Sequence, residues 1–589
     1  AFLQCASSSR GPANSEGAGD VFQKSQPAIA HNWRILIPRV GGELRTQEMM
    51  FCRVRPALVA VSAFAVVLSG ATASAATPDT QAAGQRWWSY VQQLASDQME
   101  GRLTGSEGYR RAARYVTEQF KASGLEPRGV DGYLQPVNFD VQRIQAAKSS
   151  LTLIEGNHEQ ALSLGEDALL GSRLPQPKSV EAPLVFIGYG LHIPDANYDD
   201  LAGQDLHGKI VVYLSGGPSN LASALKAHSR SPQEFYKAVE QAGAVGIASI
   251  PNPKNMDIPW SRMSLAASQP GMRLSDPAFQ DTRGPMFTVT LNPAHAEQIF
   301  TGSGHTLNEL LALGDGGKPL PRFRLTATLR ADVSALTEQV ESPNIIGVLP
   351  GSGPQRKNEY VVLSAHLDHL GIGEPINGDR VYNGAMDDAS GVATLLEVAS
   401  QLHGSDLPLK RSVLFVVVCA EEKGLLGSRY FAGHPTVPAK SMVADLNTDM
   451  FLPIIPLNNL TVYGLEESTL GDDVRAVAAG MDVKVLPDAQ PDRNIFIRSD
   501  QYNFIRAGVP SIMCAFGASP GTDEDKTMKS WLTNRYHAPS DDTNQPVDLV
   551  AAARFNRLLL TLTERIANAD ARPEWETTSF FKRFAAANN

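Results

Sequence analysis

The stretch "RSVLFVVVCAEE" (Arg411–Glu422) runs from an unbroken apolar segment into two adjacent glutamates. Continuous apolar runs of this length are typical of strands that are buried on both faces of a parallel sheet. Two further runs, "EYVVLSAHLD" (359–368) and "SMVADLNTDM" (441–450), also end on polar residues, and "ASGVATLLEVASQLH" (389–403) has helical spacing of its apolar residues. This alternation predicts an α/β fold with a mainly parallel mixed sheet flanked by helices.

The part of the chain before this sheet has a different pattern of apolar and turn-forming residues. Residues 84–125 show helical spacing, with Gly124 as a stop signal. From 140 to 335 short strand patterns alternate with turns rich in proline and glycine, with one helix expected near "PQEFYKAVEQAG" (232–243). We therefore expect one catalytic domain formed by 80–139 and 336–585, interrupted by an inserted β-rich domain at 140–335.

The N-terminal region carries a targeting pattern. Residues 49–75 combine two arginines, an apolar run (57–68) and a small-residue cleavage site (73–75), which indicates a secretory signal peptide. The apolar run is short for a membrane span. We expect residues 1–48 to be an over-extended, unstructured N-terminus. The mature protein is expected to be exported to the periplasm or the medium, without stable membrane insertion after signal cleavage.

Composition excludes some classes of function. The chain has 589 residues, a formal net charge of −10 and a pI of about 5.7. Nucleic-acid binding is therefore not expected, because it requires a basic face. Only Cys419 and Cys514 follow the signal segment, each inside an apolar run. Two buried free thiols are the favoured interpretation, with a single bridge between them left open.

Acidic and imidazole side chains follow the predicted strands at one edge of the sheet, where sites of parallel sheets lie. They are His366, Asp368, Asp387, Asp388, Glu421, Glu422 and Asp449, joined by His537 from a later loop. Each alone could be a helix cap or a packed surface residue. Together, so many carboxylates would repel one another without cations, and nitrogen and oxygen ligands suit zinc. A set of five ligands suits two ions that share a bridging carboxylate, as in aminopeptidases.

These segments resemble the co-catalytic zinc aminopeptidase family, which includes exported bacterial leucyl-type aminopeptidases and has glutamate carboxypeptidase and the transferrin receptor ectodomain as relatives. The resemblance rests on "SAHLDHLG", "NGAMDDASG", "AEEKGLLGS", "NTDM" and "YHAPSDD", in family order, and "LASDQMEGRLTGSEGYRRAARYVTEQFKASGLEP" resembles its first helices. "VFIGYGL" and "AGAVGIAS" resemble its inserted protease-associated domain. The implied fold is that of the zinc exopeptidases (phosphorylase/hydrolase-like).

The resemblance also implies roles for the site residues. His366 and Asp449 would bind one Zn²⁺, Glu422 and His537 would bind a second, and Asp387 would bridge the two. Glu421 would act as general base, and Asp368 would be a catalytic-site residue that orients the His366 ring. The implied cofactors are two Zn²⁺ ions per chain, and the implied substrates are peptides.

Some residues depart from the family pattern or stay without a metal role. Asp388 stands where relatives often have Asn, and we interpret it as an acid at a helix N-terminus. Gln501 replaces a common His in a segment that borders the substrate in the family, so it would bear on specificity. Tyr502 and Phe504 are candidates for pocket walls or for apolar packing. His369 and Asp541 are left unassigned, with local hydrogen bonding as the favoured interpretation.

The expected function is removal of N-terminal residues from peptides by a metallo-exopeptidase. A carboxypeptidase of the glutamate-releasing type, or a dipeptidase, is the main alternative, because Arg493, Arg498 and Arg535 lie in nearby loops and could bind a terminal carboxylate. A glutaminyl cyclase or a receptor-like module without catalysis is less favoured, since all five ligands and Glu421 are present. The sequence leaves the oligomeric state, the preferred residue at the cleavage site and the metal in vivo open.

Overall fold

The computed structural model describes residues 78–587 except 257 and 406. The predicted signal peptide and residues 1–48 lie outside this part, so both stay predictions. In the described residues, no helix combines the length and apolar character that crossing a membrane requires.

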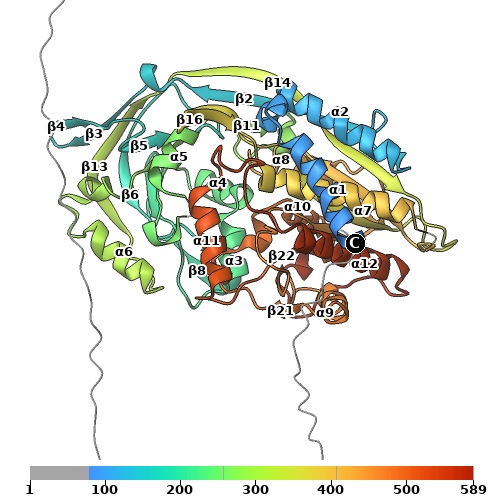
Figure 1. Cartoon of the computed structure of the whole chain (residues 1–589). Coiled ribbons are helices and arrows are strands. Elements are labelled where there is room, and N and C mark those ends of the chain that lie inside the picture. Colours follow the sequence, from blue (N-terminus) through green and yellow to red (C-terminus); the bar gives the residue numbers. More distant parts are fainter. Residues whose placement is uncertain (1–77, 257, 406, 588–589) are drawn as a thin grey trace, which may run out of the picture. The chain divides into compact units, whose positions relative to one another are not determined.

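The larger of two main sheets is a mixed sheet of ten strands, of which Figure 1 labels β2, β11, β14, β21 and β22. Its strand order is β11-β2-β14-β18-β15-β19-β22-β20-β21, with β1 paired to β14. The bounds are β1 (Glu126–Pro127), β2 (Leu134–Ile144), β11 (Gly271–Leu274), β14 (Ala335–Leu349), β15 (Tyr360–His366), β18 (Ser412–Val418), β19 (Met442–Asn447), β20 (Asn459–Tyr463), β21 (Lys484–Leu486) and β22 (Ser511–Phe516). The neighbours β18, β15, β19 and β22 run parallel, whereas β14, β2 and β11 add antiparallel strands on one side. The expected α/β class is confirmed.

The central strands are buried along their whole length, because helices cover both faces of the sheet. Successive side chains of a strand point to opposite faces, and on β15 Val361 and Leu363 join one core cluster while Val362 joins another. The first cluster includes residues of α1 (Pro78–Leu94), α2 (Glu107–Ala122), α7 (Ser390–His403), α9 (Leu470–Gly480) and α12 (Leu549–Asn568). The second includes residues of α8 (Leu426–Gly433) and α10 (Gln501–Arg506).

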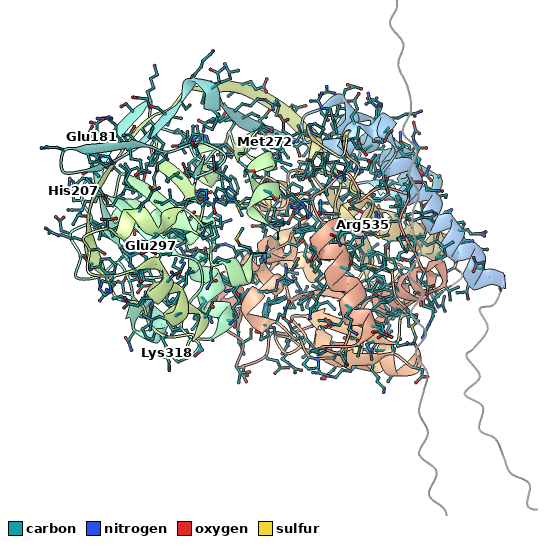
Figure 2. The ribbon with its side chains drawn as sticks, turned by 60° about the vertical axis from the view of Figure 1, so that its left-hand side comes forward. Glu181, His207, Met272, Glu297, Lys318 and Arg535 are labelled. Carbon is teal, nitrogen blue, oxygen red and sulfur yellow. The ribbon has the colours of Figure 1, made fainter. Side chains whose placement is uncertain are left out.

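A second, eight-stranded sheet is built from residues between 150 and 332. Its order is β4-β3-β13-β6-β9-β10-β12-β5. The bounds are β3 (Ser150–Glu155), β4 (His158–Ala161), β5 (Ala168–Leu170), β6 (Ser179–Phe186), β9 (Ile210–Leu214), β10 (Gly246–Ile250), β12 (Phe287–Leu291) and β13 (Phe323–Asp332). Figure 2 shows Glu181, His207, Glu297 and Lys318 on this part of the molecule and Arg535 on the part built around the first sheet.

Two features of this region differ from the sequence-based expectation. Where one helix was predicted, the structure has α3 (Ser223–Arg230), α4 (Pro232–Gln241), α5 (Trp260–Ala266) and α6 (Leu307–Asp315), because short helices of about two turns carry little periodic signal. In addition, β11 pairs with β2 in the first sheet although it lies inside the predicted insert. The predicted domain limits and the protease-associated assignment stay predictions.

The remaining elements connect or extend these two sheets. They are the hairpins β7–β8 (His192–Ile193 and Tyr198–Asp199) and β16–β17 (Gly371–Ile376 and Asp379–Tyr382), helix α11 (Asp523–Asn534) and the C-terminal helix α13 (Lys582–Ala587). Cys419 and Cys514 are buried free thiols, which confirms the favoured interpretation of both cysteines.

Candidate metal centre

The central parallel strands bring the predicted site residues to one edge of the first sheet. The last residue of β15, His366, is paired with Val418, the last residue of β18, so Glu421 and Glu422 follow at the same level. Ser364 of β15 pairs with Asn447, the last residue of β19, and Asp449 lies two residues beyond it. The carboxyl ends of parallel strands are where α/β sheets place their sites.

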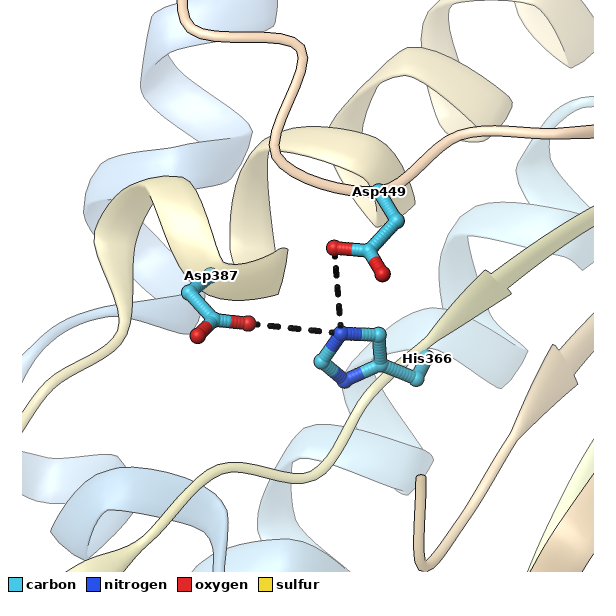
Figure 3. A group of neighbouring side chains, drawn as sticks. All are labelled: His366, Asp387 and Asp449. Carbon is cyan, nitrogen blue, oxygen red and sulfur yellow. Dashed lines mark ion pairs between the residues drawn. The ribbon is translucent and has the colours of Figure 1, made fainter. Parts of the chain in front are cut away.

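His366, Asp387 and Asp449 form a first group of possible metal ligands (Figure 3). His366 Nε2 lies 3.4 Å from Asp387 Oδ1 and 3.5 Å from Asp449 Oδ1. The side chains of His366 and Asp387 are almost completely buried, and that of Asp449 is 13% exposed. Asp387 comes from the short helical turn η7 (Ala385–Ala389) that precedes α7.

Asp387 also belongs to a second group through its other carboxylate oxygen. His537 Nε2 lies 3.2 Å from Asp387 Oδ2 and 3.3 Å from Glu422 Oε2. Burial alone would raise the pKa of Asp387, but the imidazoles of His369, His366 and His537 hold it well below its usual range. The five residues predicted as ligands therefore converge, with Asp387 between the two groups.

The two groups fit zinc in both donor chemistry and spacing. Zinc–nitrogen and zinc–oxygen bonds of about 2.0 Å in a tetrahedral site place neighbouring ligand atoms about 3.3 Å apart. The distances of 3.2–3.5 Å from His366 and His537 to the carboxylates match this spacing. In the described part of the chain, Asp387 Oδ2 and Asp449 Oδ1 are buried without a hydrogen-bond partner. A cation would satisfy these oxygens, whereas leaving them unpaired is costly.

His369 lies inside this centre, which the sequence-based assignment of local hydrogen bonding understates. Its ring is fully buried, and Nδ1 lies 2.7 Å from Glu422 Oε1 and 3.8 Å from Asp387 Oδ2. The ring packs directly against Gly384. A Cβ atom at residue 384 would lie 2.5 Å from the His369 ring, and the φ of +61° at this residue also favours glycine. The signal available in the sequence was its position one residue after Asp368, which is weak for a single histidine.

Asp368 makes its contacts differently from the expected side-chain role. Its main-chain carbonyl, not its carboxylate, lies 3.1 Å from His366 Nδ1 and so orients that ring. The carboxylate accepts hydrogen bonds from the main-chain N–H groups of Glu421 (3.1 Å) and Glu422 (3.3 Å). Asp368 therefore links the His366 loop to the turn that carries both glutamates.

The adjacent glutamates face different neighbours. Glu422 contacts His369 and His537, whereas the Glu421 carboxyl is affected electrostatically by His366 and Asp449. Burial raises the pKa of Glu421 well above its usual value, and nearby carboxylates add to this effect. A carboxyl group at the edge of such a centre can accept a proton from water and release it to a leaving group.

Asp388 and Asp541 bind main-chain groups around the centre. Asp388 Oδ1 accepts a hydrogen bond from Gly391 N (2.8 Å) at the start of α7, in agreement with its expected role at a helix N-terminus. Asp541 accepts hydrogen bonds from Met386 N (2.9 Å) and Asp387 N (3.1 Å). Asp541 thus holds the turn that presents Asp387.

The segment expected to border the substrate is buried. Gln501 is fully buried and accepts a hydrogen bond of 2.8 Å from Asn447, so it supports the end of β19. Tyr502 and Phe504 are also buried, in two separate apolar clusters. Of the two roles left open for them, the structure supports packing.

Comparison with known proteins agrees with this geometry. Residues 344–563 match the family described as Peptidase family M28. Carboxypeptidase Q from Bos taurus is 24% identical over 364 residues, which are 61% of this chain and 64% of that protein. The probable lipoprotein aminopeptidase LpqL from Mycobacterium tuberculosis is 25% identical over 437 residues, covering 72% of this chain and 71% of that protein. The chain thus spans 64% of the length of the carboxypeptidase Q that it matches.

A solved structure also resembles this chain. The aminopeptidase from Aneurinibacillus sp. strain AM-1 has a TM-score of 0.49 and 19% identity, covering 84% of this chain and 97% of that one. The family match over residues 344–563 and the aminopeptidase name of the LpqL relative confirm the expected resemblance to a peptidase family. The predicted insert at 140–335 lies outside the matched residues.

Proposed function

We propose that this chain is a zinc-dependent exopeptidase that removes N-terminal residues from peptides with two Zn²⁺ ions. The observation that carries the proposal is the sharing of Asp387 by two groups of buried donors, with 3.4 Å to His366 on one side and 3.2 Å to His537 on the other. Paired sites of this kind are used by aminopeptidases.

The ligand assignment follows from the two groups. His366 and Asp449 would hold one ion, Glu422 and His537 would hold the other, and Asp387 would contact both. When bound, zinc supplies a Lewis acid that lowers the pKa of water and polarises the carbonyl of the scissile peptide bond.

Glu421 is the proposed general base. Its carboxylate would accept a proton from the attacking water as the water oxygen bonds to the peptide carbon. The same proton would then pass to the leaving nitrogen as the carbon–nitrogen bond breaks. Asp368 would keep Glu421 in place through the hydrogen bond from Glu421 N.

A carboxypeptidase or dipeptidase activity at the same centre is the second candidate. Arg498 is close enough to act electrostatically on Tyr536, whose ring centroid lies 3.9 Å from that of the ligand His537. A cation at this position could bind the C-terminal carboxylate of a short peptide. The carboxypeptidase Q relatives add weight to this candidate by name.

One pair of assays distinguishes these candidates. Zinc content is measured on the purified protein, and hydrolysis of an amino-acid anilide is compared with that of an N-blocked dipeptide. We expect two zinc ions, cleavage of the anilide and loss of this activity after chelation. Cleavage of the N-blocked dipeptide alone would replace the aminopeptidase proposal by the carboxypeptidase one, and Arg498→Ala should then raise KM for the dipeptide. Failure to bind zinc would contradict both.

We further propose that the protein is exported, on the basis of the signal pattern at 49–75. N-terminal sequencing of the mature protein should find a start close to Ser74–Thr77. A start upstream of residue 49 would contradict both the predicted signal peptide and the predicted over-extended N-terminus.

A further inference from the structure

Arg102 is fully buried beside the candidate metal centre, and the proposed chemistry assigns no role to this arginine. It follows α1 in a tight turn in which Glu100, Gly101 and Arg102 have φ values of +49°, +62° and +50°. Such values are unusual for residues other than glycine, and they persist only when surrounding contacts hold them. The turn directs the Arg102 side chain into the protein and away from solvent.

The Arg102 guanidinium connects the N-terminal helices to two loops of the centre. Nε donates to the carbonyl of Leu367 (2.7 Å), which lies between His366 and Asp368 in sequence. Nη1 donates to the carbonyl of Asn383 (2.6 Å) and Nη2 to that of Gly384 (2.9 Å), just before the turn that carries Asp387.

Two further contacts fix the arginine itself. Nη1 also donates to the carbonyl of Leu94 (2.8 Å), the last residue of α1. The main-chain carbonyl of Arg102 accepts a hydrogen bond from His369 N (3.3 Å). The side chain therefore joins the end of α1 to two segments that lie 265 and 281 residues beyond Arg102 in the chain.

The charge of Arg102 complements the acidic centre. Burial lowers the pKa of Arg102, while Asp541, Asp387, Asp388 and Asp368 act in the opposite direction. The guanidinium therefore places a buried positive charge among these acidic side chains.

Resting on the proposed function, we infer that Arg102 is a positioning residue for metal binding. Its planar guanidinium group binds the main-chain carbonyls of Leu367, Asn383 and Gly384. These contacts fix the relative positions of the two loops, and so bring the His366 and Asp387 side chains together. A lysine has a single ammonium group on a flexible stem and cannot reproduce four hydrogen bonds in this geometry.

Arg411 provides a matched control within the same chain. It is also fully buried and donates to the carbonyls of Ile566 (2.8 Å), Ala569 (2.7 Å) and Ala571 (3.1 Å), as well as to Glu359. These contacts join the residue before β18 to the end of α12 and to the segment that follows it, and they include no proposed ligand. Arg411→Lys therefore removes a comparable buried guanidinium group at a site that has no contact with the proposed ligands.

The test compares Arg102→Lys and Arg411→Lys with the wild type. Co²⁺ affinity is measured by competition with a chelator, and the visible spectrum of the Co²⁺ protein reports ligand geometry. The urea midpoint of each apoprotein measures stability separately. We expect Arg102→Lys to weaken Co²⁺ binding about tenfold to a hundredfold and to change the spectrum, a range typical of residues that orient metal ligands. Arg411→Lys should lower the urea midpoint and leave both Co²⁺ readouts unchanged.

A measurement on the wild type keeps the inference testable if Arg102→Lys does not fold. Removal of the metal should increase hydrogen exchange of residues 99–104 and leave residues 411–413 unaffected, because only the first segment is tied to the centre. The inference would be overturned if hydrogen exchange of residues 99–104 did not change on metal removal. It would also be overturned if Arg102→Lys bound Co²⁺ as tightly as the wild type, or if Arg411→Lys lost as much Co²⁺ affinity as Arg102→Lys. Wild-type protein that binds no metal would instead contradict the proposed function.

Discussion

His369 Nδ1 lies 2.7 Å from Glu422 Oε1, which is a hydrogen-bond distance and shorter than the spacing of two ligands on one zinc ion. His537 Nε2 lies 3.3 Å from the other oxygen, Glu422 Oε2, which matches ligand spacing. The two imidazoles around Glu422 are thus assigned separate roles, with His537 as ligand and His369 as the residue that orients the Glu422 carboxylate.

Replacement of each imidazole should separate these roles. His537→Ala should remove a ligand and release the metal of its half-site. His369→Ala should keep both metals at saturating zinc but weaken the affinity of one about tenfold to a hundredfold, because Glu422 loses its orienting partner. Zinc titration with a chelating dye measures both effects, and His403→Ala, at the exposed end of α7, serves as the control. Loss of one ion in His369→Ala together with full retention in His537→Ala would reverse the assignment.

Glu421→Gln should lower turnover about 10²–10⁴-fold while zinc content stays at the wild-type level. The amide keeps the shape of the side chain but cannot accept the proton from water. Steady-state hydrolysis of an amino-acid anilide and metal analysis of the same sample check this expectation. The exposed Glu374 provides the control Glu374→Gln, which should behave as wild type. Loss of zinc in Glu421→Gln would show that Glu421, and not only Glu422, is a ligand.

Asp387→Ala should release metal from both half-sites, because both groups of donors include this carboxylate. The neighbouring Asp388→Asn is the control, since its side-chain oxygen can still accept the hydrogen bond from Gly391 N and should leave metal binding intact. Metal content after dialysis against a weak chelator measures the difference. One ion that stays bound at full affinity in Asp387→Ala would exclude a bridging role.

The positions of His366, Glu422 and Asp449 could be predicted because apolar strands and polar strand ends are local features of the sequence. The parallel strands then bring these ends to one edge of the sheet. The roles of Arg102 and His369 could not be predicted in this way. Arg102 contacts Leu367 and Gly384 across 265 and 282 residues of sequence, and no local pattern specifies such contacts.

The pairing of β11 with β2 could not be predicted for a similar reason. The sequence of β11 resembles that of any short strand, and only its pairing with β2 places it in the first sheet. Strand partners are set by tertiary packing, which a pattern of alternating residues does not specify. The extra short helices α3, α5 and α6 were missed because elements of two turns give little periodic signal.

Asp445 on β19 should make stability depend on pH. Its Oδ1 accepts a hydrogen bond from Ser364 Oγ (2.7 Å), while Oδ2 is buried with no hydrogen-bond partner in the described part of the chain. Burial raises the pKa of Asp445 to about 8. In the unfolded chain the pKa of an aspartate is about 3.9, so above that pH the unfolded state releases a proton that the folded state retains. The stabilising contribution of the protonated group is complete below about pH 4 and is lost as the pH rises toward 8.

Asp445→Asn should remove this dependence, because an amide resembles the protonated acid at every pH. The free energy of unfolding of the variant relative to wild type should increase with pH between 4 and 8, by at most about 1.4 kcal/mol per pH unit. Urea unfolding of the apoproteins at several pH values measures this difference. The proposed metal ligands are the same in wild type and variant, so their titration cancels in the comparison. The exposed Asp131 provides the control Asp131→Asn, for which the difference should stay constant. A constant difference for Asp445→Asn as well would show that Asp445 is ionised in the folded protein, with its charge compensated by groups beyond Ser364.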